Sequence, residues 1–180
     1  MRQIPTLETQ RLILRAPRED DVPAFAAFYA SDAARYVGGP LQEFEVWRYL
    51  AQVLGHWQLR GFGRWIVESK DAPGAIGLVG LHAPMDWPEP EVGWFIWSGT
   101  GQGYAVEAGH AARGFAYDTL GLTTLISSIA PGNVGSIRVA ERLGARREAD
   151  DFVHPTFGTM GLWRHPSADQ IADGGVEAYA

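Results

Sequence analysis

The sequence contains no cysteine. This absence excludes disulfide bonds, thiolate zinc sites, iron–sulfur clusters and a cysteine nucleophile. It is compatible with a reducing compartment, and we expect a cytoplasmic protein. The five histidines never stand two or four residues apart, so we also expect no metal site.

Lysine and long apolar runs are also scarce. Lys70 is the only lysine, which excludes a P-loop, because that motif needs a Gly-Lys pair beside Ser or Thr. No apolar run reaches the roughly 18 residues of a membrane span, and Met1 to Gln10 lack the apolar stretch of a secretory signal. The net charge of −6 argues against a general nucleic-acid binder. We expect neither membrane nor nucleic acid as a partner.

The chain of 180 residues fits one domain, which we place at residues 1–165. The small, acidic stretch 166–180 is expected to be a flexible tail. No Gly-x-Ser-x-Gly motif is present, which argues against a serine hydrolase of the α/β type.

The periodicity of apolar residues changes along the chain and predicts a mixed α/β layer fold. A helix is expected after Asp20 or Asp21, and a second one buries a face made of Phe44, Trp47, Leu50, Leu54 and Trp57. The expected strands are 10–16, 64–69, 75–82, 91–97, 123–130 and 158–164. Two further helices are expected, one from about 104 to 120 and one over 133–144.

The most informative segment is Gly99 to Ala105 (GTGQGYA), which follows a strand and opens a helix. The first-turn amides of a helix have no internal partners and lie at the positive end of its dipole, so they favour a phosphate. A merely flexible loop is an equal alternative from the spacing alone. The dinucleotide pattern Gly-x-Gly-x-x-Gly fails here, because Tyr104 or Val106 occupies its last position.

The order EVGWFI, GQGYAVEA, TLGL and NVGSIRVAERLGA resembles the GNAT N-acetyltransferases. The opening TLETQRLILRAPREDD is similar to that of the RimJ/RimL-type group, so the resemblance covers roughly residues 6 to 164. It implies a central mixed sheet of about six or seven strands with splayed central parallel strands, flanked by about four helices. It also implies acetyl-CoA as co-substrate, held between strands 91–97 and 123–130.

The resemblance further implies roles for individual residues. Asn133 would bind the pantetheine arm, and Arg138 would lie near the nucleotide, where a solvated helix charge is the alternative. Backbone groups of strand 91–97 would pair with the pantetheine arm, at Phe95, Ile96 and Trp97. Backbone amides of the glycine-rich segment would hold the pyrophosphate; these belong to Gly101, Gln102, Gly103, Tyr104 and Ala105.

The sequence departs from the family pattern at two places. Thr100 stands where the family usually has Gln or Arg, and the loop before Gly103 is about one residue short. Ala140 stands where many members have a tyrosine that serves as general acid. We expect the backbone amides to survive the first change, whereas the second moves the role of acid elsewhere or to water.

Acetyl transfer to an amine needs a neutral amine, a polarised carbonyl and a stabilised thiolate. A lysine-like amine has a pKa near 10.4, so its deprotonation at pH 7 costs roughly 4–5 kcal/mol. We expect Glu91 to be the general base and Ser136 to protonate the thiolate. The alternatives are an edge charge at a strand entry for Glu91 and a helix-start serine for Ser136. Weaker candidates for the base are Asp86, Asp150, Asp151 and His154, whereas His82 is expected to be a solvated residue at the end of a strand.

The acceptor is left open between a protein N-terminus and a small amine. Helix 44–57 and loop 84–90 are expected to lie over the cleft, and Trp47, Trp57 and Trp87 are candidates to line an acceptor groove. A non-catalytic acyl-CoA-binding module with a degenerate site is the alternative function. A homodimer is also left open.

Overall fold

The computed structural model describes residues 2–173, and within them it forms one eight-stranded sheet in the order β1-β2-β3-β4-β5-β6-β8-β7. The pair β5–β6 is parallel and the other neighbouring pairs are antiparallel. The strands are β1 (Leu7–Glu8), β2 (Leu12–Arg15), β3 (Arg64–Ser69), β4 (Ala72–His82), β5 (Glu91–Ile96), β6 (Ile126–Ile129), β7 (Arg146–His154) and β8 (Gly158–Arg164).

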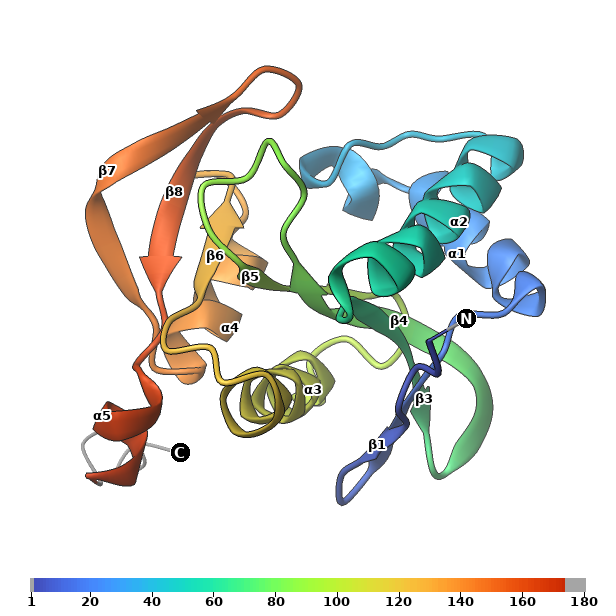
Figure 1. Cartoon of the computed structure of the whole chain (residues 1–180). Helices are drawn as coiled ribbons and strands as arrows, with labels where there is room; N and C mark the ends of the chain where they lie inside the picture. The colour runs from blue at the N-terminus through green and yellow to red at the C-terminus, as the bar shows by residue number, and fades with distance from the viewer. Residues whose placement is uncertain (1, 174–180) are drawn as a thin grey trace.

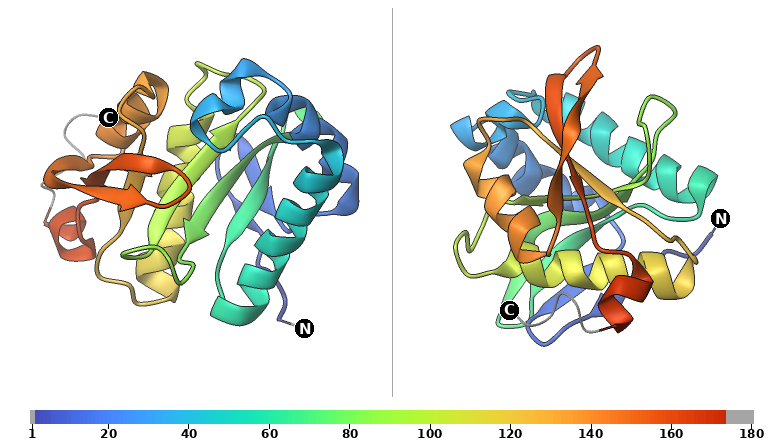
Figure 2. Two further views of the ribbon diagram at one scale, coloured as in Figure 1. Left: turned by 90° about the horizontal axis from the view of Figure 1, so that it is seen from above. Right: turned by 90° about the vertical axis from the view of Figure 1, so that its left-hand side faces the viewer.

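The helices lie on both faces of the sheet (Figure 1). Helices α1 and α2 pack together over one face, and α3 packs against β4 and β5 on the other. Figure 2 shows the β7–β8 hairpin and α4 on the opposite side of β5 from α1 and α2. The helices are α1 (Val22–Tyr29), α2 (Glu43–Arg60), α3 (Tyr104–Gly114), α4 (Val134–Arg142) and α5 (Ala168–Ala172), with short turns 19–21 and 32–36 and a π-helical segment 115–119.

The mixed α/β prediction is confirmed, with one more strand than the upper expectation. Strands β3 and β8 have the predicted bounds, whereas β6 is four residues long. Strand β7 is an addition that the sequence pattern did not predict. The short helix α5 lies in the segment that we expected to be a flexible tail, and residues 174–180 of that segment lie outside the described part.

The core lies between the sheet and its helices. On α2 the buried face is Val46, Leu50, Val53 and Trp57, because these residues pack toward α1 and the sheet. The predicted face was therefore partly wrong; its members Phe44, Trp47 and Leu54 are among the exposed large apolar residues.

Several boundaries follow from local chemistry. Gly61 ends α2 with φ of 82°, a left-handed conformation that glycine adopts without strain. Asp21 precedes α1 but makes no side-chain cap; its carboxylate instead accepts from the Arg15 guanidinium at 2.7 and 2.9 Å. None of the helices between residues 2 and 173 has the length and apolar character needed to cross a membrane.

Candidate active site

The parallel strands β5 and β6 separate almost at once. Their register contains a single pair, Glu91 with Ile126, and the Ile126 amide donates to the Pro90 carbonyl at 3.1 Å. A continued parallel ladder would have the Ser128 amide donate to the Val92 carbonyl. That amide donates instead to Glu91 Oε2 at 3.2 Å. The strands therefore open into a wedge whose apex is at Glu91.

The side chains of Glu91 and Ser127 replace the missing ladder bonds at the apex. Ser127 Oγ donates to the Val92 carbonyl at 2.6 Å and lies 2.9 Å from His165 Nε2. Burial lowers the pKa of His165 to about 3, with nearby Arg113, His110 and Arg164 adding to the effect. The imidazole is therefore neutral near pH 7, and its Nε2–H can donate to Ser127 because the serine proton is used on Val92.

The edge of β5 beyond the apex faces the wedge. The Trp97 amide donates to the Ile76 carbonyl at 3.0 Å, so its backbone points toward β4. Since backbone direction alternates along a strand, Phe95 also points toward β4, whereas Trp94 and Ile96 point into the wedge. The expectation for Ile96 agrees with this geometry. The expectations for Phe95 and Trp97 do not fit this geometry, because their backbone groups face β4; Trp94 is the second residue whose backbone faces the wedge.

The glycine-rich segment ends at the start of α3, and most of its amides have no backbone acceptor among the described residues. Gly101 and Gly103 have φ of 89° and 82°, a conformation that keeps the chain tight without side chains. The amides of Gly101, Gly103, Tyr104 and Ala105 form no backbone hydrogen bond with other described residues. The Gln102 amide differs, because it donates to the Gly99 carbonyl at 3.2 Å inside the turn. The residues present fit a pyrophosphate.

Arg11 connects this segment to the N-terminal strands. Its Nη1 donates to the Gln102 carbonyl at 2.9 Å, and its Nε donates to Glu107 Oε2 at 2.6 Å. The guanidinium also lies 4.9 Å from the Tyr104 ring centre. Burial acts to raise the pKa of Glu107, but bonds from Thr9 and Arg11 outweigh it and the pKa is lowered. Sequence reasoning did not single out Arg11, because its partners lie more than 90 residues away along the chain.

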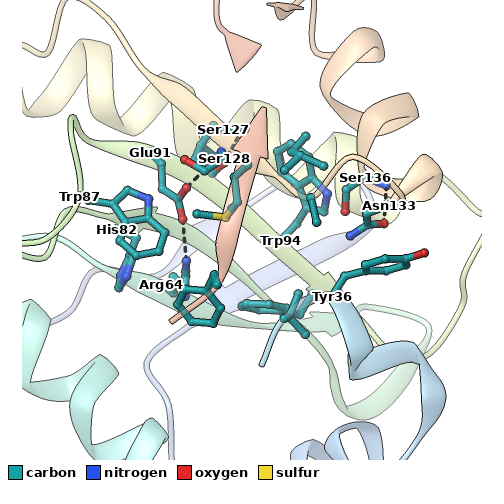
Figure 3. A pocket seen from close by; sticks show the side chains of 18 of the residues that line it. Tyr36, Arg64, His82, Trp87, Glu91, Trp94, Ser127, Ser128, Asn133 and Ser136 are labelled. Atoms are coloured by element: carbon teal, nitrogen blue, oxygen red, sulfur yellow. Dashed lines mark hydrogen bonds and ion pairs between the residues drawn. The ribbon is translucent and has the colours of Figure 1, made fainter. Parts of the chain in front are cut away.

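A cavity of about 280 Å³ opens at the wedge (Figure 3). It is lined by β5 and β6, by Tyr49 and Gln52 of α2, and by the loop that contains Trp87. The expectation that helix 44–57 and loop 84–90 border the cleft is thus confirmed. Of the three tryptophans considered for an acceptor groove, Trp87 lines the cavity; Trp57 is buried in the core and Trp47 is exposed on α2.

Glu91 is the buried carboxylate of this cavity. Its Oε1 accepts from Arg64 Nη2 at 2.9 Å, and both side chains are 7% exposed. Arg64 also donates to the Tyr49 hydroxyl, whose pKa is raised by burial. Figure 3 shows Arg64, His82 and Trp87 around this carboxylate. Sequence reasoning identified Glu91 but not Arg64, which comes from β3.

His82 lines the same cavity from the end of β4, where the sequence suggested a solvated end residue. Its ring stacks 5.4 Å from His56 and lies 5.3 Å from Trp87. Burial lowers the pKa of His82 to about 2, and the charges of Arg64 and His56 act in the same direction. His82 is therefore a neutral wall of the cavity at physiological pH.

Helix α4 begins at the other end of the cavity. Asn133 caps it, with Oδ1 accepting from the Ser136 amide at 3.2 Å, and both side chains line the cavity. Ala140 is fully buried against Ile129, so the place of the family tyrosine is filled by core packing. Arg138 is exposed on α4 outside the cavity lining.

The weaker candidates for the base separate into two groups. His154 ends β7, its Nδ1 accepts the amides of Thr156 and Phe157, and its Nε2 lies 3.1 Å from Asp86 at the cavity rim. Asp150 and Asp151 are exposed on β7 and are not among the cavity residues. Within residues 2–173, no group of three His, Cys, Asp or Glu is placed to hold a metal ion.

A wedge between parallel strands that leads to an amide-rich helix start has the donors that suit an extended chain bearing phosphates, as in acyl-CoA-dependent transferases. Residues 11–146 match the family model described as an acetyltransferase (GNAT) domain. Because the match spans most of the chain, the protein belongs to the GNAT acetyltransferase family.

Relatives agree with this assignment. A solved acetyltransferase from Agrobacterium tumefaciens str. C58 is 34% identical, with a TM-score of 0.82 over 92% of this chain and 96% of that one. The Bacillus subtilis (strain 168) protein named "Uncharacterized N-acetyltransferase YoaA" is 29% identical over 153 residues, 80% of this chain and 84% of its own. RimL, a ribosomal L7/L12 alpha-N-protein acetyltransferase solved with coenzyme A, shares the fold at 16% identity, with a TM-score of 0.70 over 90% and 98% of the two chains.

Proposed function

We propose that the protein transfers the acetyl group of acetyl-CoA to a primary amine by direct attack in a ternary complex. The observation that carries the proposal is the wedge between β5 and β6, which joins the free amides of α3 to a cavity containing a buried carboxylate. The amine nitrogen forms a bond to the acetyl carbon and the carbon–sulfur bond breaks. The amine gives up one proton, and the leaving thiolate takes one.

We assign the co-substrate to main-chain groups. The amides of Gly101, Gly103, Tyr104 and Ala105 would hold the pyrophosphate, and the wedge-facing edge of Trp94 and Ile96 would pair with the pantetheine arm. An N–H on that edge can also polarise the acetyl carbonyl. The motif TLETQRLILR supports a place in the RimJ/RimL-type group.

We assign the proton transfers to side chains of the cavity. Each Glu91 oxygen already accepts one hydrogen bond and retains a lone pair, so the carboxylate can accept a proton from the incoming amine. Ser136 lines the cavity beside Asn133 and is the proposed donor to the thiolate. Arg138 near the nucleotide remains a prediction.

The test of the base is Glu91→Gln, which preserves the shape and an acceptor for Arg64. We expect kcat to fall by about 100-fold, the usual contribution of general-base catalysis, with acetyl-CoA affinity within threefold. The matched control is Glu89→Gln in the loop that leads into β5, because Glu89 pairs with Arg164 rather than with a cavity residue. Equal rates for the two variants, measured by release of free thiol, would contradict the role of Glu91.

The test of the acid is Ser136→Ala, which should lower kcat more than acetyl-CoA affinity. Calorimetry with acetyl-CoA followed by the thiol assay on a panel of amines tests the function as a whole. Binding without turnover of any amine would support the non-catalytic alternative, and no binding would exclude both functions.

A further inference from the structure

The acidic groups that line the cavity already have cationic or protonated partners. Glu91 pairs with Arg64 at 2.9 Å, and Asp86 lies 3.1 Å from His154 Nε2. The His154 Nδ1 accepts two backbone amides, so its Nε2 carries the proton that faces Asp86. Among residues 2–173, no other Asp or Glu lines the cavity. A second ammonium group on the acceptor would therefore find no unpaired carboxylate.

The same pairing limits how strongly the cavity can remove a proton. Protonation of Glu91 would leave the buried Arg64 guanidinium without its counter-charge. His82, the imidazole beside it, is a weak proton acceptor because burial lowers its pKa to about 2. An amine that is already partly neutral at pH 7 suits this site better than a strongly basic one. An α-amine has a neutral fraction roughly 300 times that of a lysine-like amine at that pH.

Three polar atoms around the carboxylate are buried without a partner: Trp87 Nε1, Arg64 Nε and Ser128 Oγ. Two of them are N–H donors, and all three residues line the cavity. Buried donors are normally paired, so this arrangement favours a substrate that brings an oxygen acceptor close to its amine. A carbonyl next to the amine carbon meets that requirement and is also what lowers the pKa of an α-amine.

The remaining wall is aromatic. Trp87 lies 5.9 Å from Phe157 and 5.3 Å from His82, between ring centres, and Tyr49 of α2 also lines the cavity. Such a wall favours a flat or bulky apolar group on the substrate. The volume of about 280 Å³ also favours a small group there.

These four observations converge on one acceptor class. We propose that the acceptor is the α-amine of an amino-acid amide or of a peptide N-terminal residue that carries an aromatic or large apolar side chain. The carbonyl next to the amine accepts from the Trp87 indole N–H, and the side chain packs on Trp87 and Phe157. This inference rests on the proposed function and names its substrate.

The first experiment compares kcat/KM at pH 7.0 for five acceptors by thiol release. Phenylalaninamide should exceed phenethylamine, which lacks the carboxamide, by at least about tenfold. It should exceed alaninamide by about 10- to 100-fold, because the ring is buried. Spermidine should be a poor acceptor. The peptide Phe-Gly-Gly identifies the source: a rate above that of phenylalaninamide indicates a chain terminus, and a lower rate indicates a free small molecule.

The second experiment uses Trp87→Phe, which retains an aromatic ring and removes the N–H. The preference for phenylalaninamide over phenethylamine should fall about fivefold, with acetyl-CoA affinity unchanged. Trp47→Phe is the matched control, because Trp47 is 51% exposed on α2 outside the cavity. It should leave the preference as in the wild type.

The outcomes separate the two proposals. Turnover of spermidine or phenethylamine at rates equal to phenylalaninamide would overturn the acceptor class and leave the acetyltransferase function standing. Acetyl-CoA binding without turnover of any of the five amines would overturn the proposed function itself. The wild-type comparison decides the acceptor class even if Trp87→Phe does not fold.

Discussion

The pyrophosphate site can be tested with two glycines that share a backbone conformation. Gly101 has φ of 89° and Gly121 has φ of 68°, and a Cβ atom at either position would meet nothing within 4 Å. Alanine at positive φ destabilises the folded state by about 1–2 kcal/mol. Alanine also lowers the conformational entropy of the unfolded chain, which offsets about 0.4–1 kcal/mol of that cost. Each Gly→Ala variant should therefore lose about 1 kcal/mol of stability, a fall in Tm of about 2–4 °C for a chain of this size.

The two variants should differ in coenzyme binding. Gly101 lies in the amide-lined turn before α3, whereas Gly121 follows the far end of that helical region. Relaxation of the turn at residue 101 would move at least one amide off the phosphate. A hydrogen bond to a charged group contributes about 1.5–3 kcal/mol, which corresponds to a Kd raised about 10- to 150-fold. Calorimetry with coenzyme A measures this directly. If Gly101→Ala binds within twofold of Gly121→Ala at equal Tm, the pyrophosphate does not lie on these amides.

Two further predictions concern the surroundings of the site. Arg11→Ala removes the link to Gln102 and should raise the Kd for coenzyme A about 3- to 10-fold, whereas exposed Arg48→Ala should not change it; equal affinities would show that the link is dispensable. His165 has a folded pKa of about 3 against 6.5 unfolded, so its contribution is complete above pH 6.5 and is lost as the pH falls toward 3. Protonation of His165 in the unfolded chain should lower the free energy of unfolding by about 2 kcal/mol between pH 7 and pH 5. In urea titrations, the free energy of unfolding of His165→Gln should therefore fall by about 2 kcal/mol less than that of the wild type over the same pH range. An identical pH dependence in both proteins would argue against a buried neutral imidazole.

The sequence predicts local structure well where one face of an element is apolar. Strands β3 and β8 have their predicted bounds, and Gly61 ends α2. Strand β7 was missed because its run Arg146–His154 is mostly charged and exposed. It is an edge strand that pairs with β8 alone, and charges are common on such edges because they discourage pairing with other chains.

The residues that line the candidate site were predicted in part, for a related reason. Glu91, Asn133 and Ser136 lie in motifs that the sequence displays, and all three line the cavity. Arg64 reaches Glu91 from a strand 27 residues earlier, and no local pattern records that contact. The orientation of Phe95 and Trp97 depends on which side of β5 pairs with β4, which periodicity alone does not determine.

The division between main chain and side chains at the wedge has a consequence for how such a protein diversifies. The phosphate and pantetheine contacts that we propose come from peptide groups, whose positions depend on the fold rather than on residue identity. Another part of the cavity lining consists of side chains from α2, the 84–90 loop and the β7–β8 hairpin. Mutations there can change the accepted amine one residue at a time while the donor half of the reaction stays intact. The range of accepted amines can therefore change while the binding of the acetyl donor is retained.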